Sequence, residues 1–177
     1  MIASDDWGRI EAITLDSSAD YPDLGQIRAY WDRRRGDRFA PRRADIDPAD
    51  LKEFLSRIMI ADVLRDPMEF RYRLSGTNIG SVHGQEMTGK RPRDLTPAAY
   101  GELIHAHYCE AVERRQPLLH LILLDTSQRS RSYARLLLPL SEDGETVSML
   151  LTIDSREQNS KALRDFFAKT LPLVQAS

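Results

Sequence analysis

The chain has 177 residues, 41% of them hydrophobic and 29% charged, which is the composition of an ordinary globular protein with one domain and extensions. Its formal net charge of -2 provides no overall attraction to nucleic acid or to a membrane surface. No apolar run approaches the roughly 20 residues of a membrane-spanning helix, the first residues lack the pattern of a secretory signal, and the single cysteine, Cys109, excludes an intrachain disulfide. We therefore expect a cytoplasmic protein that is not attached to a membrane.

Residues 1–22 are weakly patterned, and we expect an N-terminal arm there. A short added strand around Ile10–Leu15 and a loosely held arm both fit this pattern. Residues 23–55 are predicted to form a helical extension that begins with a helix over 23–35. The helix carries an apolar stripe at helical spacing, made of Leu24, Ile27, Tyr30 and Trp31. This stripe predicts contact either with the domain's own sheet or with a second copy of the chain.

The next predicted elements are a short helix and a hairpin. Asp47-Pro48 has the features of a helix start, and the helix should end near Leu55. Strands are expected over 58–63 and 68–74, where apolar and polar residues alternate. The segment 75–95 contains four glycines and predicts short helical turns and loops. Thr96-Pro97 then opens a long helix that ends near Arg115, before Pro117.

Three strands separated by short polar turns follow over 117–125, 133–140 and 146–154. Such spacing predicts an antiparallel meander, because short loops join only antiparallel neighbours. Pro139 cannot donate to a ladder, so it indicates a strand end, a bulge or an unpaired position. Residues 156–177 are expected to form a C-terminal helix, over 160–171, and a tail.

Several strings, together with this order of elements, resemble the PAS family of sensor domains, and most closely its short bacterial proteins built around a single PAS domain. The strings are Tyr30-Trp31, Arg35-Gly36, Pro41-x-Arg43-x-Asp45-Ile46-Asp47-Pro48, Phe70-Arg71-Tyr72-Arg73-Leu74-Ser75-Gly76-Thr77, Gly84-Gln85-Glu86-Met87-Thr88-Gly89 and Leu138-Pro139-Leu140. The resemblance implies an α+β fold over residues 56–155. Its five-stranded antiparallel sheet would have the order 2-1-5-4-3, with helices covering one face and often enclosing a small pocket.

The same resemblance implies a homodimer, because many such proteins dimerise through an N-terminal helix. Here that helix is 23–35, with Leu24, Ile27, Tyr30 and Trp31 at the interface. Larger relatives drive a kinase or a nucleotide cyclase through the PAS unit. This chain would have to pass its signal to a separate protein or to a second copy.

A ligand pocket is expected between the inner face of the sheet and the segment Gly76–Ala111. Strand alternation and the implied topology select its lining as Tyr72, Leu74, Ile79, Val82, Leu103, His107, Leu121 and Leu137. A register shift of one residue replaces half of the strand residues in this set. The alternative is that all eight side chains simply fill the core.

Sequence motifs for other chemistries are incomplete. Gly84–Lys90 has the spacing of a phosphate loop, but Arg91 stands where Ser or Thr is needed, so we interpret it as an ordinary turn. His105 and His107 are two residues apart on the long helix and point about 200° apart; the apolar stripe selects His107 as the one facing the sheet. In some PAS proteins a histidine on this helix ligates haem, but a packed histidine is the favoured interpretation. The Asn-Cys-Arg-Phe string of the flavin-binding subclass does not occur.

Two further clusters contain residue types that can bind ligands or act in catalysis. His105 and Cys109 are four residues apart, but nothing in the sequence completes a zinc site or a nucleophile with its orienting group. The segment 28–43 contains seven arginines interleaved with two aspartates, Asp32 and Asp37. Asp45 follows just beyond this segment. Such a cluster of arginines would suit an anion or nucleic acid, although a solvated helix face with local ion pairs is favoured.

The favoured hypothesis is a non-enzymatic sensory or regulatory protein, homodimeric, that binds a small ligand, a partner protein or both, with any cofactor unknown. Two alternatives remain: a ligand-free interaction scaffold, and binding of an anion or nucleic acid through the arginine-rich segment 28–43. Nucleic acid is the less expected partner.

Overall fold

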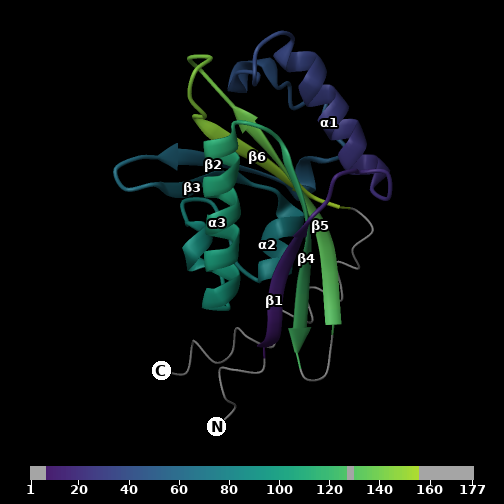
Figure 1. Cartoon of the computed structure of the whole chain (residues 1–177), viewed down its shortest axis with the longest axis vertical. Helices are drawn as coiled ribbons and strands as arrows, with labels where there is room; N and C mark the ends of the chain where they lie inside the picture. Colours follow the sequence, from purple (N-terminus) through teal and green to yellow (C-terminus); the bar gives the residue numbers. More distant parts are fainter. Residues whose placement is uncertain (1–6, 127–129, 156–177) are drawn as a thin grey trace.

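A six-stranded antiparallel sheet organises the molecule, with its strands in the order β1-β4-β5-β6-β2-β3 (Figure 1). The computed structural model describes residues 7–126 and 130–155, so the helix predicted over 160–171 lies outside the described residues. The strands are β1 (Trp7–Thr14), β2 (Ile58–Leu64), β3 (Glu69–Ser75), β4 (Leu118–Thr126), β5 (Ser130–Leu140) and β6 (Met149–Asp154). The helices are α1 (Pro22–Arg35), α2 (Thr77–His83) and α3 (Ala98–Arg114).

Five of the six strands are those expected from the sequence, and their spatial order β3-β2-β6-β5-β4 is the predicted order 2-1-5-4-3. The prediction of five strands is wrong, because β1 adds a sixth that pairs antiparallel with β4 (Figure 1). Ile10 and Ala12 of β1 pack against the core, whereas Ile13 is 47% exposed. This alternation of half-buried and exposed residues is typical of an edge strand. The sequence alone could not decide between such a strand and a loosely held arm.

The helix predicted from Asp47 to Leu55 is instead a run of turns that ends in a 3-10 turn at Leu55–Arg57. Its backbone bonds run from residue i to residue i−3: Leu51 N–H donates to Pro48 O, and Phe54 N–H donates to Leu51 O. Leu51, Phe54 and Arg57, each three residues from the next, are the buried side chains of this stretch. A spacing of three residues between buried side chains matches the 3-10 helix better than the wider α-helical turn. Burial of these side chains therefore favours 3-10 turns over an α-helix.

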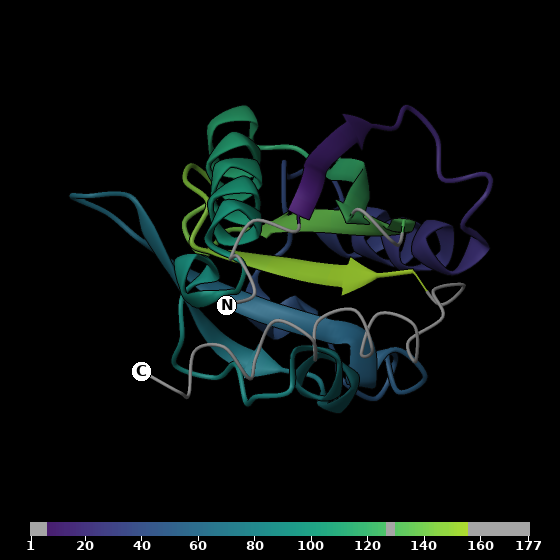
Figure 2. The ribbon, with the colours of Figure 1, turned by 90° about the horizontal axis from the view of Figure 1, so that it is seen from below.

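Helices cover both faces of the sheet, so the expectation of helices on one face is wrong. Helices α2 and α3 lie on what we call the inner face, and α1 with residues 36–57 lies on the outer face (Figures 1 and 2). On β5, Leu137 belongs to the inner core, whereas Leu136 and Leu138 belong to the outer core. A strand that is apolar on both sides needs cover on both sides. The outer core therefore contains both α1, from the predicted 23–55 extension, and strands of the predicted 56–155 domain.

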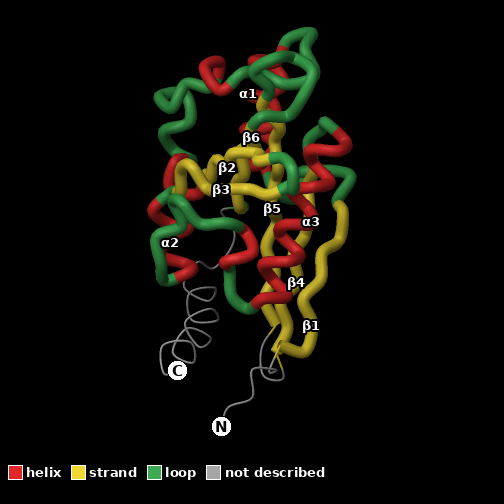
Figure 3. Tube along the Cα trace, turned by 90° about the vertical axis from the view of Figure 1, so that its left-hand side faces the viewer, coloured by secondary structure: helices red, strands yellow, loops and turns green. Residues whose placement is uncertain are grey.

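The sheet is strongly twisted: in Figure 3 β2 and β3 run across the view, while β1 and β4 run along it. The exposed edge at β3 is partly closed by the turn at Gly89–Lys90. Gly89 N–H donates to Tyr72 O over 2.7 Å, and Tyr72 N–H donates to Lys90 O over 2.8 Å. None of the helices in the described ranges has the length and hydropathy to cross a bilayer.

Pro139 pairs with Leu150 of β6 but has no strand partner on its other side, so the unpaired position that the sequence left open applies to that side alone. The pairing of β5 with β4 ends at Leu137, opposite Leu118, which is the first residue of β4, so no β4 residue lies beside Pro139. Its missing N–H costs no ladder bond there, and its carbonyl oxygen accepts a hydrogen bond from Trp31 Nε1 over 2.7 Å. The indole of α1 thereby fastens the helix to the outer face.

Candidate functional site

A buried arginine lies on the inner face of β5. The Arg135 side chain is only 4% exposed, and its Nε donates to Asp154 Oδ1 over 2.9 Å. Its Nη2 donates to the hydroxyls of Tyr100 (3.2 Å) and Tyr133 (3.0 Å), which also contact each other. The remaining nitrogen, Nη1, is buried and has no hydrogen-bond partner among the described residues. We call Arg135, Asp154, Tyr100 and Tyr133 the Arg135 cluster.

The Arg135 cluster keeps its arginine charged. Burial opposes the charge, but the Asp154 carboxylate and the oxygens of Tyr133 and Tyr100 outweigh it, so the pKa of Arg135 is raised well above its ordinary value. Burial also raises the pKa of Tyr100 and of Tyr133. At neutral pH the site therefore holds one cation, one carboxylate and two protonated phenols.

Histidines near this cluster are held neutral. Burial, and then the positive charge of Arg135, lowers the pKa of His83 to about 3. Burial also lowers the pKa of His107 to about 3, with smaller contributions from His120 and Arg135. The rings of His107 and His120 stack with their centroids 3.9 Å apart. His107 therefore packs against another ring in the interior, as the favoured interpretation of a packed histidine expects.

Six of the eight predicted ligand residues lie on the inner side. Tyr72, Ile79, Val82 and Leu137 belong to the inner core, Leu103 packs against it, and His107 is buried beside His120. Large side chains dominate this core; those that are almost wholly buried include Phe70, Tyr72, Tyr100, Tyr108, Met87 and Ile104. The six residues thus lie together, within a densely occupied face.

Leu74 and Leu121 point to the outer side instead, so their assignment to an inner pocket is wrong. In β3 a bulge intervenes: Tyr72 pairs with Ala61, but Leu74 pairs with Ile60, leaving Arg73 as the extra residue. Leu74 therefore shares the outer face with Ile60. Leu121 pairs with Ala134, which belongs to the outer core. Strand β4 is apolar at both parities, so its sequence gave no signal for the face of Leu121.

The Arg135 cluster was not predicted from the sequence. A charged residue within the apolar run Tyr133–Leu140 was the signal for Arg135, because an arginine there must be paired if both faces are covered. Its partner Asp154, at the end of β6, could not be chosen from the sequence among many carboxylates.

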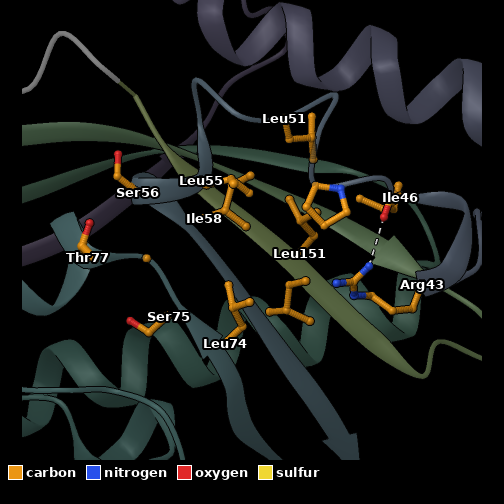
Figure 4. Close-up of a pocket in the computed structure, with 13 residues that line it drawn as sticks. Arg43, Ile46, Leu51, Leu55, Ser56, Ile58, Leu74, Ser75, Thr77 and Leu151 are labelled. Carbon is orange, nitrogen blue, oxygen red and sulfur yellow. Dashed lines mark hydrogen bonds between the residues drawn. The ribbon is translucent and has the colours of Figure 1, made fainter.

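A groove opens on the outer face, between residues 43–57 and strands β2, β3 and β6 (Figure 4). Its volume is about 320 Å³. Its apolar lining consists of Ile46, Pro48, Leu51, Leu55, Ile58, Ile60, Leu74 and Leu151, and its polar lining of Arg43, Ser56, Ser75 and Thr77, with Gly76. We call this the outer groove, and Leu74 is its one residue from the predicted pocket.

The four residues predicted for a dimer interface lie in the chain's own core. Leu24, Ile27, Tyr30 and Trp31 are at most 9% exposed and pack with the outer residues of β5 and β6. Of the two partners that the sequence allowed for this stripe, the structure selects the sheet of the same chain. The stripe is therefore not exposed as a surface for a second copy.

The arginines of segment 28–43 are largely paired within the segment and its neighbours. Arg28 and Arg35 both bond Asp32, Arg34 bonds Asp50, and Arg38 bonds Asp45. These pairs neutralise much of the positive charge that a nucleic acid would need. Such local ion pairs are expected of a solvated helix face, which is the favoured interpretation of this segment.

His105, expected to face away from the sheet, is buried against β3. Its ring packs edge-on against Phe70, its Nε2 lies 3.4 Å from Cys109 Sγ, and its Nδ1 lies 3.3 Å from Glu69 Oε1 without alignment for a hydrogen bond. Burial is the main cause that raises the pKa of the Cys109 thiol. A protonated thiol is a poor nucleophile, so the arrangement is not that of an activated cysteine.

The phosphate-loop-like string forms the end of α2 and the following turn. Gly84 is the left-handed C-cap of α2, and its N–H donates to Gly80 O. Lys90 Nζ contacts Gln85 within the same turn. The string thus follows a helix rather than a buried strand, which is not the setting of a phosphate loop.

Comparison with known proteins gives a family. The model of the family described as PAS domain matches residues 20–172. Among solved structures, an RNA-binding Light-Oxygen-Voltage receptor is similar at 12% sequence identity and a TM-score of 0.47, over 94% of this chain and 43% of that one. That likeness is too distant to carry an argument, and the chain spans less than half of that receptor's length. A search of curated proteins gave no match. Because the family match extends over most of its length, the chain belongs to the PAS domain family.

Proposed function

We propose that the protein is a non-enzymatic sensory module that binds a small ligand beside Arg135 and passes the signal in trans to a partner protein or a second copy. The observation that carries the proposal is Nη1 of Arg135, a buried charged donor without a partner in the described residues. A buried donor of this kind costs free energy unless an acceptor meets it. Such an unsatisfied group marks a place for a bound molecule or ion.

The surroundings define what kind of ligand fits. Arg135 Nη2 donates to the hydroxyls of Tyr100 and Tyr133, and because these hydroxyls also bond each other, the pair uses one of its two hydroxyl hydrogens and can offer the other to an acceptor beside Nη1. His83 and His107 remain uncharged at neutral pH, since their pKa values are about 3. A small molecule with an oxygen acceptor, such as a carboxylic acid bound in its neutral form, would satisfy Nη1 without adding a second negative charge beside Asp154.

A second candidate function, a ligand-free interaction module, rests on a different observation. The inner face carries many large, almost wholly buried side chains, among them Tyr72 and Tyr108, whose rings pack edge-on at 6.3 Å. If these side chains fill the space completely, a single ordered water would serve Nη1. The protein would then signal through contacts alone.

Native mass spectrometry of the full chain, with an ultraviolet–visible spectrum and a thermal-shift screen of small organic acids, separates the two functions. We expect an added mass that leaves on denaturation, or a stabilising acid, with the wild type and with Leu74→Ala on the opposite face. Tyr133→Phe should weaken the binding, and Arg135→Met should abolish it. Circular dichroism checks that each variant is folded, and Tyr133→Phe keeps the test usable if Arg135→Met unfolds. A bare mass with no stabilising acid would favour the interaction module.

A further inference from the structure

We propose that the outer groove is a second binding site, on the face of the sheet opposite Arg135, for a small aliphatic carboxylate. The aliphatic chain would lie on the leucines and isoleucines of the groove, and its carboxylate would pair with Arg43. The proposal goes beyond the sensory site on the inner face and does not depend on it.

The groove exposes apolar surface that an aliphatic chain would cover. Leu55 and Leu74, which line it, are 37% and 38% exposed, and they are two of the three large hydrophobic side chains that the described residues leave exposed. They converge in one concavity with Ile58 and Leu151 (Figure 4). Covering such surface drives binding in proportion to its area, and exposed apolar surface gathered in a groove typically marks a ligand site.

The volume limits the size of the ligand. About 320 Å³ is at the lower end of the range of roughly 300–1,000 Å³ found for small-molecule sites. The space suits a medium-length alkyl chain and is small for a helix or a sterol. We therefore assign it to a fatty acid of medium length rather than to a partner protein.

The positive charge of Arg43 determines at which end of the groove the carboxylate of the ligand would lie. Arg43 stands at one end of the groove, where its Nη1 donates to Ile46 O over 3.1 Å (Figure 4). Unlike Arg34, Arg35 and Arg38, which bond aspartates, Arg43 has its guanidinium in no ion pair with a carboxylate of the described residues. The nearby Glu142 carboxylate accepts the Arg43 backbone N–H at 2.9 Å and forms no ion pair with the guanidinium. The guanidinium is thus available to a carboxylate, to which arginine forms strong charge-assisted bonds.

The far end of the groove is polar but uncharged. Ser56, Ser75 and Thr77 lie there, across the apolar middle from Arg43 (Figure 4). Ser75 Oγ is buried and has no hydrogen-bond partner among the described residues. A positive group at one end, an apolar middle and hydroxyls at the other end fit a carboxylate whose tail ends beside a small polar rim.

Close packing fixes one wall of the groove in advance. At Gly76 an added Cβ would lie 2.3 Å from the backbone oxygen of Ser56, and Gly76 N–H donates to Ile58 O over 2.8 Å. Residues 55–58 are thereby held against the start of α2. A site that is already formed loses less free energy to ordering when its ligand arrives.

Calorimetric titration of the full chain with octanoate, decanoate and dodecanoate, each below its micelle concentration, tests the site. We expect saturable one-to-one binding whose Kd worsens about tenfold for each two methylenes removed. Arg43→Gln should weaken dodecanoate about tenfold, because a charged hydrogen bond is lost. Dodecanol should bind the wild type as weakly as dodecanoate binds Arg43→Gln, and dodecyltrimethylammonium should not bind.

Matched variants locate the binding. Leu74→Asp should abolish it, whereas Ile13→Asp, at the third exposed hydrophobic residue, and Arg42→Gln, an exposed arginine outside the groove, should leave it unchanged. Tyr133→Phe should also leave it unchanged, which separates this site from the inner one. The proposal is overturned if dodecanoate does not saturate, if Leu74→Asp binds like the wild type, or if dodecanol binds as tightly as dodecanoate.

Discussion

The two faces of the sheet are built from different materials. The inner face combines aromatic side chains with a buried arginine, a carboxylate and neutral histidines, and the Arg135 cluster gives it a set of defined hydrogen bonds. The outer face is mainly aliphatic: leucines and isoleucines of β2, β5 and β6 meet the stripe of α1 and residues 40–54. Its polar contacts include the Trp31 indole to Pro139 O and the ion pair of Arg57 with Asp23 over 2.7 Å.

The two faces therefore differ in how strictly their contacts fix the positions of the side chains. A buried ion pair surrounded by hydroxyls allows few alternative arrangements, because each donor lost or misplaced remains uncompensated. Aliphatic contacts are non-directional, so they tolerate small shifts in the positions of the side chains. Since residues 47–57 form turns rather than a helix, they cover the outer face incompletely and leave the outer groove open.

A pair of leucines on opposite faces of the sheet gives the largest expected contrast. Leu137→Ala removes a wholly buried inner side chain and should lower the free energy of unfolding by about 2–5 kcal/mol. Leu74→Ala removes a side chain that is 38% exposed at the outer groove and should cost less than about 1 kcal/mol. Urea unfolding of both variants measures the difference. Equal losses would contradict the assignment of Leu74 to the outer side.

Gly76→Ala tests the junction at which the chain leaves the groove wall and enters α2 on the inner side. The new Cβ would overlap the backbone of Ser56, which cannot move aside as a side chain would. We expect a loss of about 1–3 kcal/mol from overpacking. Thr77→Ala, at the next and exposed position, is the matched control and should behave like the wild type in the same thermal or urea unfolding.

Acid should weaken the inner face through its neutral histidines. Burial holds the pKa of folded His107 at about 3, below its ordinary value of about 6.5. Below that ordinary value the unfolded chain binds a proton that the folded chain does not, so stability falls as the pH drops towards the folded pKa. From about pH 7 to about pH 5.5, His107 alone should cost about 1 kcal/mol.

His107→Leu removes this titration, so its unfolding free energy should fall by about 1 kcal/mol less than that of the wild type over the same pH interval. Comparing each protein with itself at the two pH values cancels the constant cost of losing the stack on His120. An unchanged pH slope would show that His107 accepts a proton in the folded state.

Local patterns predicted most of the elements. The stripe of α1, the hairpin β2–β3, the long helix α3 and the meander β4–β6 follow from helical and two-residue periodicity, with Pro22, Gly36 and Pro117 near the ends. Two errors came from single-residue events: the bulge at Arg73 turned Leu74 outward, and three-residue spacing made turns of residues 48–57. Local sequence does not encode either event strongly.

The sequence by itself determined which residues are apolar and with what period, and hence the strands, their order by resemblance, and the burial of the α1 stripe against some sheet. Only the tertiary structure decided that this sheet is the chain's own, that both faces are covered, and that Arg135 meets Asp154, Tyr100 and Tyr133. Periodicity is a property of neighbours in the chain, which a sequence displays directly. The face on which a strand's side chains lie, and the partner of a buried charge, depend on register and packing between segments far apart in the chain.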